Sequence, residues 1–264
     1  MPIKFKDISK GPSDLLSDDY TSSVTLKCKK GAGPIAVTIE TDRSSSGALS
    51  SKIGGKLSYK GVSFDKIQFK ADGGHVLETS TVPYPDFKLS FKGNKGADLG
   101  VDYGKGNLAL TSVLDVKDMS KFSTSGCVSL SSGIVLGGDA SYSISKSSLS
   151  GYNLGASYSS GNMFGSITTA SKVSQANLGL LYKVNNELSV ATKTTHAADK
   201  PFGSFSVGCS YNAAFGIVKA KVADGGVISA AVVTDIAPKV TLTASGTMTG
   251  TDSSTFKYGL GIVM

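Results

Sequence analysis

The sequence predicts an all-β chain, in which one large sheet closes into a barrel and a short helix precedes it. The first observation is an alternation of apolar and polar residues, clear in Leu108–Leu114, Leu188–Thr194 and Phe256–Met264. A period of two is typical of strands with one apolar and one polar face. The second is that glycine- or serine-rich breaks separate these segments from end to end, with no helical pattern between them. The third is the composition of the polar face, described below.

Composition and length are consistent with one domain. The chain has 264 residues and 32 glycines, well above the usual glycine share of about 7%, and no linker or charge block divides it. No apolar stretch reaches the roughly 18 residues of a transmembrane helix, and residues 1–7 lack the apolar core of a secretory signal. A closed barrel leaves only a weak alternating signal, so neither absence excludes a membrane.

Charge and reactive residues argue against two classes of protein. The formal charge of +7 is carried almost entirely by scattered lysines, and Arg43 is the one arginine. Nucleic-acid-binding proteins use arginine forks and basic clusters, so we expect no nucleic-acid partner. His75 and His196 lie on distant segments without cysteines or acids at ligand spacing. We therefore expect no catalytic residue, metal site or cofactor, and no enzyme.

The first element is a short helix. Gly11–Asp19 is predicted to form one or two helical turns, because Pro12 lies near the first helical position and an aspartate follows it. We divide the chain into an N-terminal helical segment, 1–22, and a β-barrel, 23–264. The apolar stripe of the helical segment would consist of Phe5, Ile8, Leu15 and Leu16.

About nineteen strands of roughly ten residues with short turns are expected to follow. They are Ser23–Lys30, Ile35–Asp42, Lys52–Lys60, Val62–Ala71, His75–Val82, Phe87–Gly93, Ala97–Tyr103, Asn107–Lys117, Phe122–Leu130, Ile134–Ser145, Ser150–Ser159, Met163–Ser171, Gln175–Val184, Glu187–His196, Phe202–Tyr211, Phe215–Ala223, Val227–Asp235, Val240–Met248 and Phe256–Met264.

The two faces distinguish a barrel from a soluble sandwich. A sandwich of so many strands needs two sheets with twisted edges that must be protected, whereas a closed barrel has no edges and leaves a lumen wide enough for water. Small residues on the polar phase, including Gly137, Gly155 and Gly179, are poor material for a packed core. They favour a wetted lumen wall, and hence the barrel.

Motifs at both ends of the chain resemble those of mitochondrial outer-membrane porins, the voltage-dependent anion channels, and plant and protist members look most similar. Phe5–Lys10, followed by Asp14–Leu16 and Tyr20, resembles the segment and short amphipathic helix that open those sequences. Val218–Val222 and Pro238–Thr243 resemble the late strands of the family. The last strand resembles the sorting signal of mitochondrial β-barrels through Lys257, Gly259, Leu260 and Ile262.

The resemblance implies a 19-stranded transmembrane barrel, with parallel first and last strands and the N-terminal segment inside the pore. The implied function is a voltage-gated, weakly anion-selective channel, through which ions and small metabolites, including adenine nucleotides, diffuse across the mitochondrial outer membrane. The implied partners are the lipid bilayer, small anionic metabolites (ATP, ADP and phosphate) and further copies of the chain.

Lysines on the polar phase would concentrate anions in the lumen, although a position at the rim is the alternative for any one of them. The lysines expected to line the pore are Lys4, Lys6, Lys10, Lys27, Lys29, Lys52, Lys56, Lys88, Lys92, Lys219 and Lys221. The N-terminal segment is expected to dock and gate through Phe5, Asp7, Ile8, Leu15 and Leu16. The alternative for this segment is a helix on the membrane surface.

The chain departs from the family at two places. A Gly-Leu-Lys motif linked to nucleotide contact is replaced by Asp86-Phe87-Lys88, which keeps only the lysine. Animal members place an acid on the membrane face of the fourth strand, and Asp65 is the candidate here. Counting from Phe69 puts Asp65 on the outward phase, whereas counting from Phe64 puts it on the inward phase. A membrane-facing Asp65 and a bulge near Asp65–Lys66 therefore both remain open.

Two other classes remain as alternatives. A protein-import pore of the same superfamily would carry a longer N-terminal extension and a more acidic interior, and neither is found here. A soluble or secreted β-repeat protein would need no detergent to stay dispersed.

Overall fold

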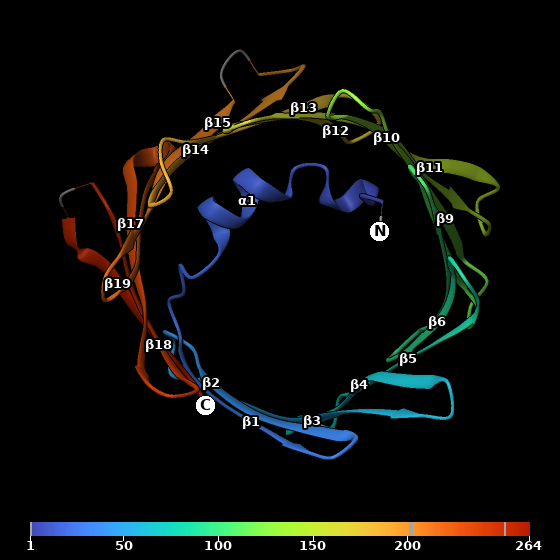
Figure 1. The fold of residues 1–264 in the computed structure, drawn as a ribbon, viewed down its shortest axis with the longest axis horizontal. Coiled ribbons are helices and arrows are strands. Elements are labelled where there is room, and N and C mark those ends of the chain that lie inside the picture. The colour runs from blue at the N-terminus through green and yellow to red at the C-terminus, as the bar shows by residue number, and fades with distance from the viewer. Residues whose placement is uncertain (1, 201–202, 251) are drawn as a thin grey trace.

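The structure, a computed structural model, describes residues 2–200, 203–250 and 252–264. Nineteen strands form one sheet in which consecutive strands are hydrogen-bonded, and the pairing of β1 with β19 closes the sheet into a barrel (Figure 1). The predicted all-β barrel of nineteen strands is therefore confirmed. The predicted start of one strand, Phe202, lies outside the described residues. No helix of the described residues is long and apolar enough to cross a membrane.

The strands begin and end within a few residues of their predicted bounds, except that β19 begins four residues early. They are β1 Val24–Ala32, β2 Ile35–Arg43, β3 Leu49–Tyr59, β4 Val62–Lys70, β5 His75–Tyr84, β6 Phe87–Gly93, β7 Ala97–Lys105, β8 Leu108–Asp115, β9 Lys121–Ser129, β10 Ile134–Ser143, β11 Ser148–Ser160, β12 Met163–Ala170, β13 Gln175–Lys183, β14 Leu188–Ala197, β15 Ser204–Ala213, β16 Gly216–Ala223, β17 Val227–Ala237, β18 Val240–Thr249 and β19 Asp252–Val263. A short 3-10 helix, Asp224–Gly226, connects β16 and β17.

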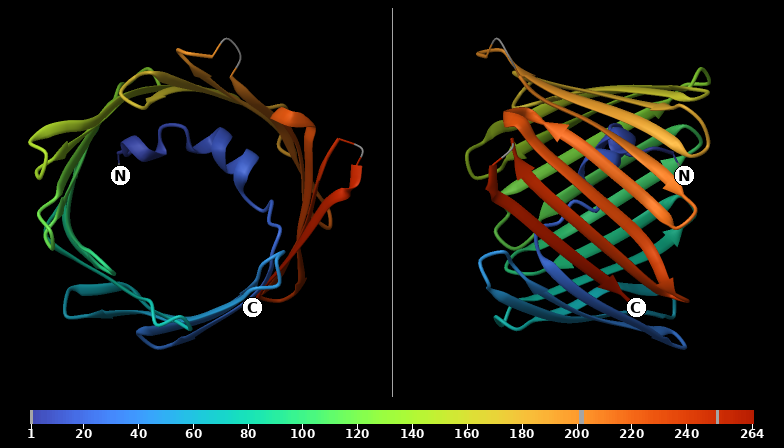
Figure 2. Two further views of the ribbon diagram at one scale, coloured as in Figure 1. Left: turned by 180° about the vertical axis from the view of Figure 1, so that it is seen from behind. Right: turned by 90° about the vertical axis from the view of Figure 1, so that its left-hand side faces the viewer.

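The barrel closes through one parallel pair. Consecutive strands alternate in direction, so an odd number of them brings the first and last strands together running the same way. Val24 lies beside Leu260 and Lys27 beside Val263 in this pair. The backbone N–H of Met264 donates to the carbonyl of Lys27 at 2.9 Å. The strands are tilted relative to the barrel axis (Figure 2), as a closed barrel requires.

The apolar phase of the strands points outward. Leu178, Leu180 and Tyr182 on β13 are 41%, 54% and 52% exposed, and many other large apolar side chains are similarly uncovered by protein. A continuous belt of this kind is suited to lipid rather than to water. The polar phase points into the lumen, where the buried wall residues Ala109, Cys127, Val135 and Ala191 lie beneath the N-terminal segment.

The N-terminal segment lies inside the barrel (Figures 1 and 2). It contains a 3-10 turn, Phe5–Asp7, and helix α1, Lys10–Ser17. The turn contacts β9 and β10, and α1 contacts β13, β14 and β15. Helix α1 begins one residue before the predicted start and ends two residues before the predicted end. From α1 the chain runs along the wall past β16 and β18 and enters the sheet at β1 (Figure 1).

Candidate functional site

The lumen has two unlike walls, which we name here. The helix-bearing wall is β8–β16, residues 108–223, and the N-terminal segment lies against it. The open wall is β1–β6, residues 24–93, and Figure 1 shows no helix in front of it. The functional residues of each wall are described in turn.

The first docking point on the helix-bearing wall surrounds Ile8. This side chain is 1% exposed and forms a buried cluster with Ala109, Cys127 and Val135, from β8, β9 and β10. Phe5 packs against the same cluster. Burying an isoleucine of this kind stabilises the docked segment by about 2 kcal/mol. Because Phe5 and Ile8 face the wall, the exposed Lys6 is left on the open side of the lumen.

The second docking point lies further along the chain, in helix α1. Leu15 and Leu16 are 7% and 4% exposed and form a cluster with Ala191 of β14, against which Leu181 of β13 packs. Adjacent leucines on a helix cover neighbouring strands, so this pair fixes the rotation of α1. Lys10, Ser17 and Asp18 remain exposed on the opposite side of the segment.

Glycines on the wall make room for these side chains. A Cβ added to Gly155 would lie 3.0 Å from Cε2 of Phe5, and one added to Gly208 would lie 2.9 Å from Cδ2 of Leu16. Real Cβ atoms rarely approach other atoms so closely. We call these wall glycines the glycine track. Because they have no side chains, the N-terminal segment can lie directly against the backbone of the wall.

Two of the other glycines that predicted a wetted wall belong to the same track. A Cβ on Gly137 would lie 3.1 Å from Phe5, and one on Gly179 would lie 3.2 Å from Pro12. The inference that these glycines line water is thus wrong for Gly137, Gly155 and Gly179. They indicate close packing of the N-terminal segment, because their missing side chains leave the space that it fills.

Two lysines on β16 hold the C-terminal end of α1. Lys219 Nζ lies 2.6 Å from Asp19 Oδ2, and Lys221 Nζ donates to the carbonyl of Leu16 at 2.7 Å. A cation at this end of a helix satisfies a free carbonyl and interacts favourably with the helix dipole. Lys221 also lies over the ring of Tyr20, 4.2 Å from its centroid. We call these contacts the latch; two lysines predicted to attract anions are engaged in it.

Tyr20 contributes to the latch as a neutral phenol. Burial raises the pKa of Tyr20 to about 12, with smaller contributions from nearby Cys209 and Asp19. A neutral ring offers its negative face to the ammonium of Lys221, which is the geometry of a cation–π contact.

A separate anchor fixes the point where the segment enters the wall. The backbone N–H of Thr21 donates to Ser245 Oγ at 3.1 Å, and the same hydroxyl donates to the carbonyl of Thr21 at 2.6 Å. Gly259 lies directly beneath, where any Cβ would collide with the Thr21 carbonyl group. The four predicted sorting-signal residues lie on both faces of β19. By alternation Lys257 and Gly259 lie on the lumen face, and Leu260 and Ile262 lie on the outer face.

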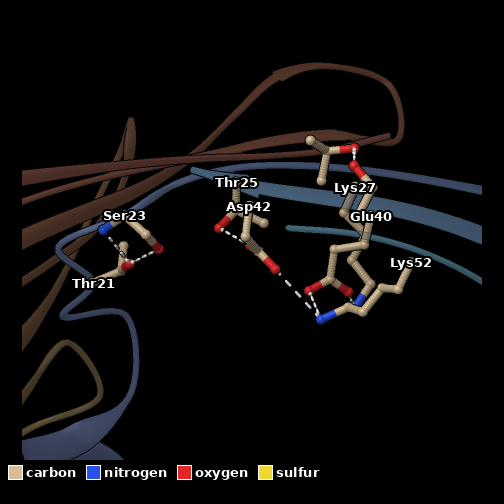
Figure 3. A network of polar contacts seen from close by, with 9 residues as sticks. Thr21, Ser23, Thr25, Lys27, Glu40, Asp42 and Lys52 are labelled. Atoms are coloured by element: carbon tan, nitrogen blue, oxygen red, sulfur yellow. Dashed lines mark hydrogen bonds and ion pairs between the residues drawn. The ribbon is translucent and has the colours of Figure 1, made fainter. Parts of the chain in front are cut away.

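The open wall carries an ion-paired network (Figure 3). Glu40 accepts from two lysines, with Lys27 Nζ at 3.1 Å and Lys52 Nζ at 2.5 Å. Lys52 also lies 3.4 Å from Asp42, whose other oxygen accepts from Thr25 Oγ1 at 2.6 Å. These groups come from β1, β2 and β3 and lie side by side because Lys27, Glu40 and Lys52 occupy one row of the register.

Asp65 faces the lumen, and the membrane-facing position considered from the sequence is wrong. Its carboxylate accepts from Ser80 Oγ at 2.6 Å and lies 3.4 Å from Lys88 Nζ. Lys88 stands opposite Asp102 of β7 in the register. Asp102 in turn pairs with Lys4 of the N-terminal segment. The bulge considered as the alternative is the reason: the β4–β5 register shifts between Phe64 and Lys66, which re-aims the side chain between them.

The other predicted lysines lie as follows. Lys4 pairs with Asp102 of β7 at 2.8 Å, and Lys92 pairs with Glu78 at 3.4 Å. Lys29 and Lys56 line a hollow of the open wall without an ion pair to any other described residue. Asp7, predicted to help docking, likewise forms no ion pair within the described part of the chain.

Sequence reasoning missed the ion pairs that these lysines form with Asp19, Glu40, Asp42, Glu78 and Asp102. A signal existed for Glu40, because the tight turn at Gly33–Pro34 fixes a register in which Lys27 stands opposite Glu40. No local signal pointed to Asp19, whose partner is 200 residues away in the sequence. Within the described ranges, no group of three or more histidines, cysteines or acids is arranged to hold a metal ion.

A closed β-barrel with an apolar outer belt and a charged lumen defines a membrane pore protein. The chain belongs to the eukaryotic porin family, whose sequence pattern matches residues 1–261. It is 24% identical over 256 residues to mitochondrial outer membrane protein porin 4 of Arabidopsis thaliana, covering 92% of this chain and 90% of that protein.

Solved structures of bacterial porins share the fold. One engineered variant of the Rhodopseudomonas blastica porin, a triple mutant, superposes with a TM-score of 0.52 at 13% identity, covering 80% of this chain and 88% of that one. A second engineered variant of the same porin gives a TM-score of 0.51 at 13% identity with the same coverage.

These findings confirm the predicted family and fold. The protein is a pore that spans a lipid bilayer and passes small solutes, and its family is one of channels rather than enzymes. The predicted location, the mitochondrial outer membrane, is that of the plant relative.

Proposed function

We propose that this protein is a voltage-gated, weakly anion-selective channel of the mitochondrial outer membrane. Ions and small anionic metabolites, including ATP, ADP and phosphate, would cross it by passive diffusion. The observation that carries the proposal is the lumen itself, with lysines left free on one wall and a separately attached helix on the other. Membership of the eukaryotic porin family and the plant relative's location support the choice of membrane.

Anion preference would come from lysines whose charge no neighbour neutralises. Lys29 and Lys56 on the open wall, and Lys6 and Lys10 on the N-terminal segment, have no ion pair among the described residues. Their field raises the local concentration of anions. Because a Debye length at physiological salt is about 8 Å, the preference should be weak and should fade as salt rises.

Voltage gating would be carried by the N-terminal segment, residues 1–22. Every strand is hydrogen-bonded on both sides, whereas this segment is attached through two apolar clusters, the Lys4–Asp102 ion pair, the latch and the anchor at Thr21. It carries three lysines and four aspartates, on which the membrane potential acts at about 2.3 kcal/mol per charge per 100 mV. Undocking about a fixed anchor would move these charges through the lumen.

Two further roles stay predictions. We infer that Lys257, Gly259, Leu260 and Ile262 direct insertion of the barrel as a sorting signal, since they occupy the last strand. Association of several copies in the membrane is a second prediction, which cross-linking in lipid vesicles can test.

Single-channel recording in planar bilayers tests the proposal. With a KCl gradient, the reversal potential should indicate chloride preference at low salt and approach zero selectivity at high salt. A preference for potassium at low salt would contradict it. A protein that is monodisperse in plain buffer without detergent would instead support the soluble β-repeat alternative.

A further inference from the structure

We propose that the open wall contains a binding site for compact polyphosphate anions. The site is a hollow of about 850 Å³ between β1 and β5, which falls in the range of small-molecule sites, about 300–1,000 Å³. Five of the lysines that line it lie on the lumen phase, namely Lys27, Lys29, Lys52, Lys56 and Lys66, while Lys30 borders it from the outward phase of β1. The inference rests on the proposed channel function, because the ligand reaches the hollow through the lumen.

The carboxylates of the hollow do not cancel this charge. Three of them line it, Glu40, Asp65 and Glu78. Lys88 lies 3.4 Å from Asp65 and Lys92 lies 3.4 Å from Glu78, and both lysines come from β6, outside the lining. Two of the three acids are thus paired from outside. The five lysines of the lumen phase therefore face Glu40 and, through Lys52, Asp42.

Glu40 also positions the lysines. It holds Lys27 Nζ at 3.1 Å and Lys52 Nζ at 2.5 Å, so one negative charge fixes two positive ones. Lysine side chains otherwise lose considerable freedom when they bind a ligand, and fixing them in advance reduces that cost. The Lys27–Glu40–Lys52 row is visible as a continuous chain of contacts in Figure 3.

The register gives the hollow a floor between two charged rows. In the row next to Lys27–Glu40–Lys52, Lys29 stands beside Thr38 and Thr38 beside Gly54, which has no side chain. The following row places Lys56 beside Ala36. An anion on the Thr38–Gly54 floor would therefore have ammonium groups on several sides and a hydroxyl beneath it.

This arrangement selects for a ligand with several charges. Lysine binds phosphate as a point charge, and ammonium groups on strands roughly 4.8 Å apart cannot all be engaged by one small ion. A chain of phosphates, free or attached to a nucleoside, can engage several at once. Tripolyphosphate and ATP should therefore bind at the same place, and orthophosphate should bind more weakly.

A matched pair of double variants tests the site. Lys29→Gln/Lys56→Gln removes two charges from the hollow, and Lys121→Gln/Lys183→Gln removes two from the lumen phase at strand ends of the helix-bearing wall. Each protein is refolded in detergent micelles, its β-sheet content is verified by circular dichroism, and tripolyphosphate is titrated at low salt by calorimetry. The same proteins are then placed in planar bilayers, where block of the chloride current by tripolyphosphate is measured.

We expect Lys29→Gln/Lys56→Gln to bind tripolyphosphate roughly tenfold more weakly than the unaltered protein, and the control variant to bind it unchanged. Equal affinities in all three proteins would overturn the proposal, as would an equal loss in both variants, since that indicates only the overall charge of the lumen. ATP that fails to compete with tripolyphosphate would also overturn it.

The bilayer arm separates the two proposals. A protein that conducts no current would reject the proposed channel function, while the micelle titration would still decide the hollow. An anion-selective channel whose affinity for tripolyphosphate is unaffected by Lys29→Gln/Lys56→Gln would reject the hollow alone.

Discussion

The two walls of the lumen share one backbone architecture and differ in the side chains that face inward. Where the helix-bearing wall lies beneath Phe5, Leu16 and their neighbours, these are small, as at Gly155, Gly208 and Ala191. On the open wall they are long and charged, as at Lys27, Glu40 and Lys52. In a barrel of uniform strands, the size of the inward side chains thus decides where a helix can pack and where the lumen stays open.

Removing the occupant of the helix-bearing wall should have the largest effect. Deletion of residues 1–20 removes both apolar clusters and the Asp19 partner of the latch, while the Thr21 anchor remains. We expect normal voltage closure to be abolished in planar bilayers, with selectivity still set by the open wall. Unchanged gating after the deletion would show that the segment is not the moving part.

Filling the glycine track should have the next largest effect. In Gly155→Val the new side chain would collide with Phe5 and Ile8, weakening docking by about 2 kcal/mol. Cys127 lies beneath Ile8 and is 2% exposed, so undocking should uncover its thiol. With Cys28 and Cys209 replaced by serine, Gly155→Val should therefore be labelled faster by a small maleimide than the parent protein.

Gly151→Val is the matched control, because Gly151 lies on the same strand with nothing within 4 Å of an added Cβ. Its labelling rate should equal that of the parent protein. Equal labelling rates in the two valine variants would contradict the claim that the glycine track makes room for the N-terminal segment.

Breaking the latch should have a smaller effect. Lys219→Ala removes a contact between groups that are 12% and 33% exposed, so the expected loss of docking free energy is about 1 kcal/mol. A double-mutant cycle with Asp19→Asn, read by the same maleimide labelling, should give a coupling energy of that size. If the free-energy changes of the two single variants add up to that of the double variant, the ion pair does not hold the helix.

The smallest effect concerns charge on the open wall. Glu40→Gln removes the one carboxylate shared by Lys27 and Lys52, which adds a net positive charge to the lumen. The reversal potential should shift slightly further toward chloride preference at low salt, and the shift should vanish at high salt. Glu187→Gln, at the exposed turn before β14, should leave the reversal potential unchanged; a shift toward potassium in Glu40→Gln would have the wrong sign.

The sequence was sufficient for the barrel and insufficient for what docks within it. Strands can be predicted because alternation is a local property. The conflict between Phe64 and Phe69 within one strand likewise raised a bulge near Asp65 as an alternative, and the structure contains it. The docking track could not be recognised, because a glycine facing water and a glycine beneath a helix are identical in sequence.

The same limit applies to charge. Lys219 and Lys221 were expected to attract anions, yet they bind Asp19 and the Leu16 carbonyl. Which lysines remain free depends on contacts between segments about 200 residues apart, and no local pattern encodes them. The sequence therefore predicted a lumen that carries lysines. It did not predict which lysines are free on the open wall and which are bound to the N-terminal segment.

A reversible cross-link tests most directly whether the N-terminal segment must leave the helix-bearing wall for the channel to close. Ile8→Cys places a thiol in the cluster that contains Cys127, with Cys28 and Cys209 replaced by serine and Ile8→Ser as the uncross-linked control. The oxidised channel should keep its open conductance and lose voltage closure, and a reductant should restore closure. Undiminished voltage closure in a quantitatively cross-linked channel would contradict the claim that this wall holds the gate.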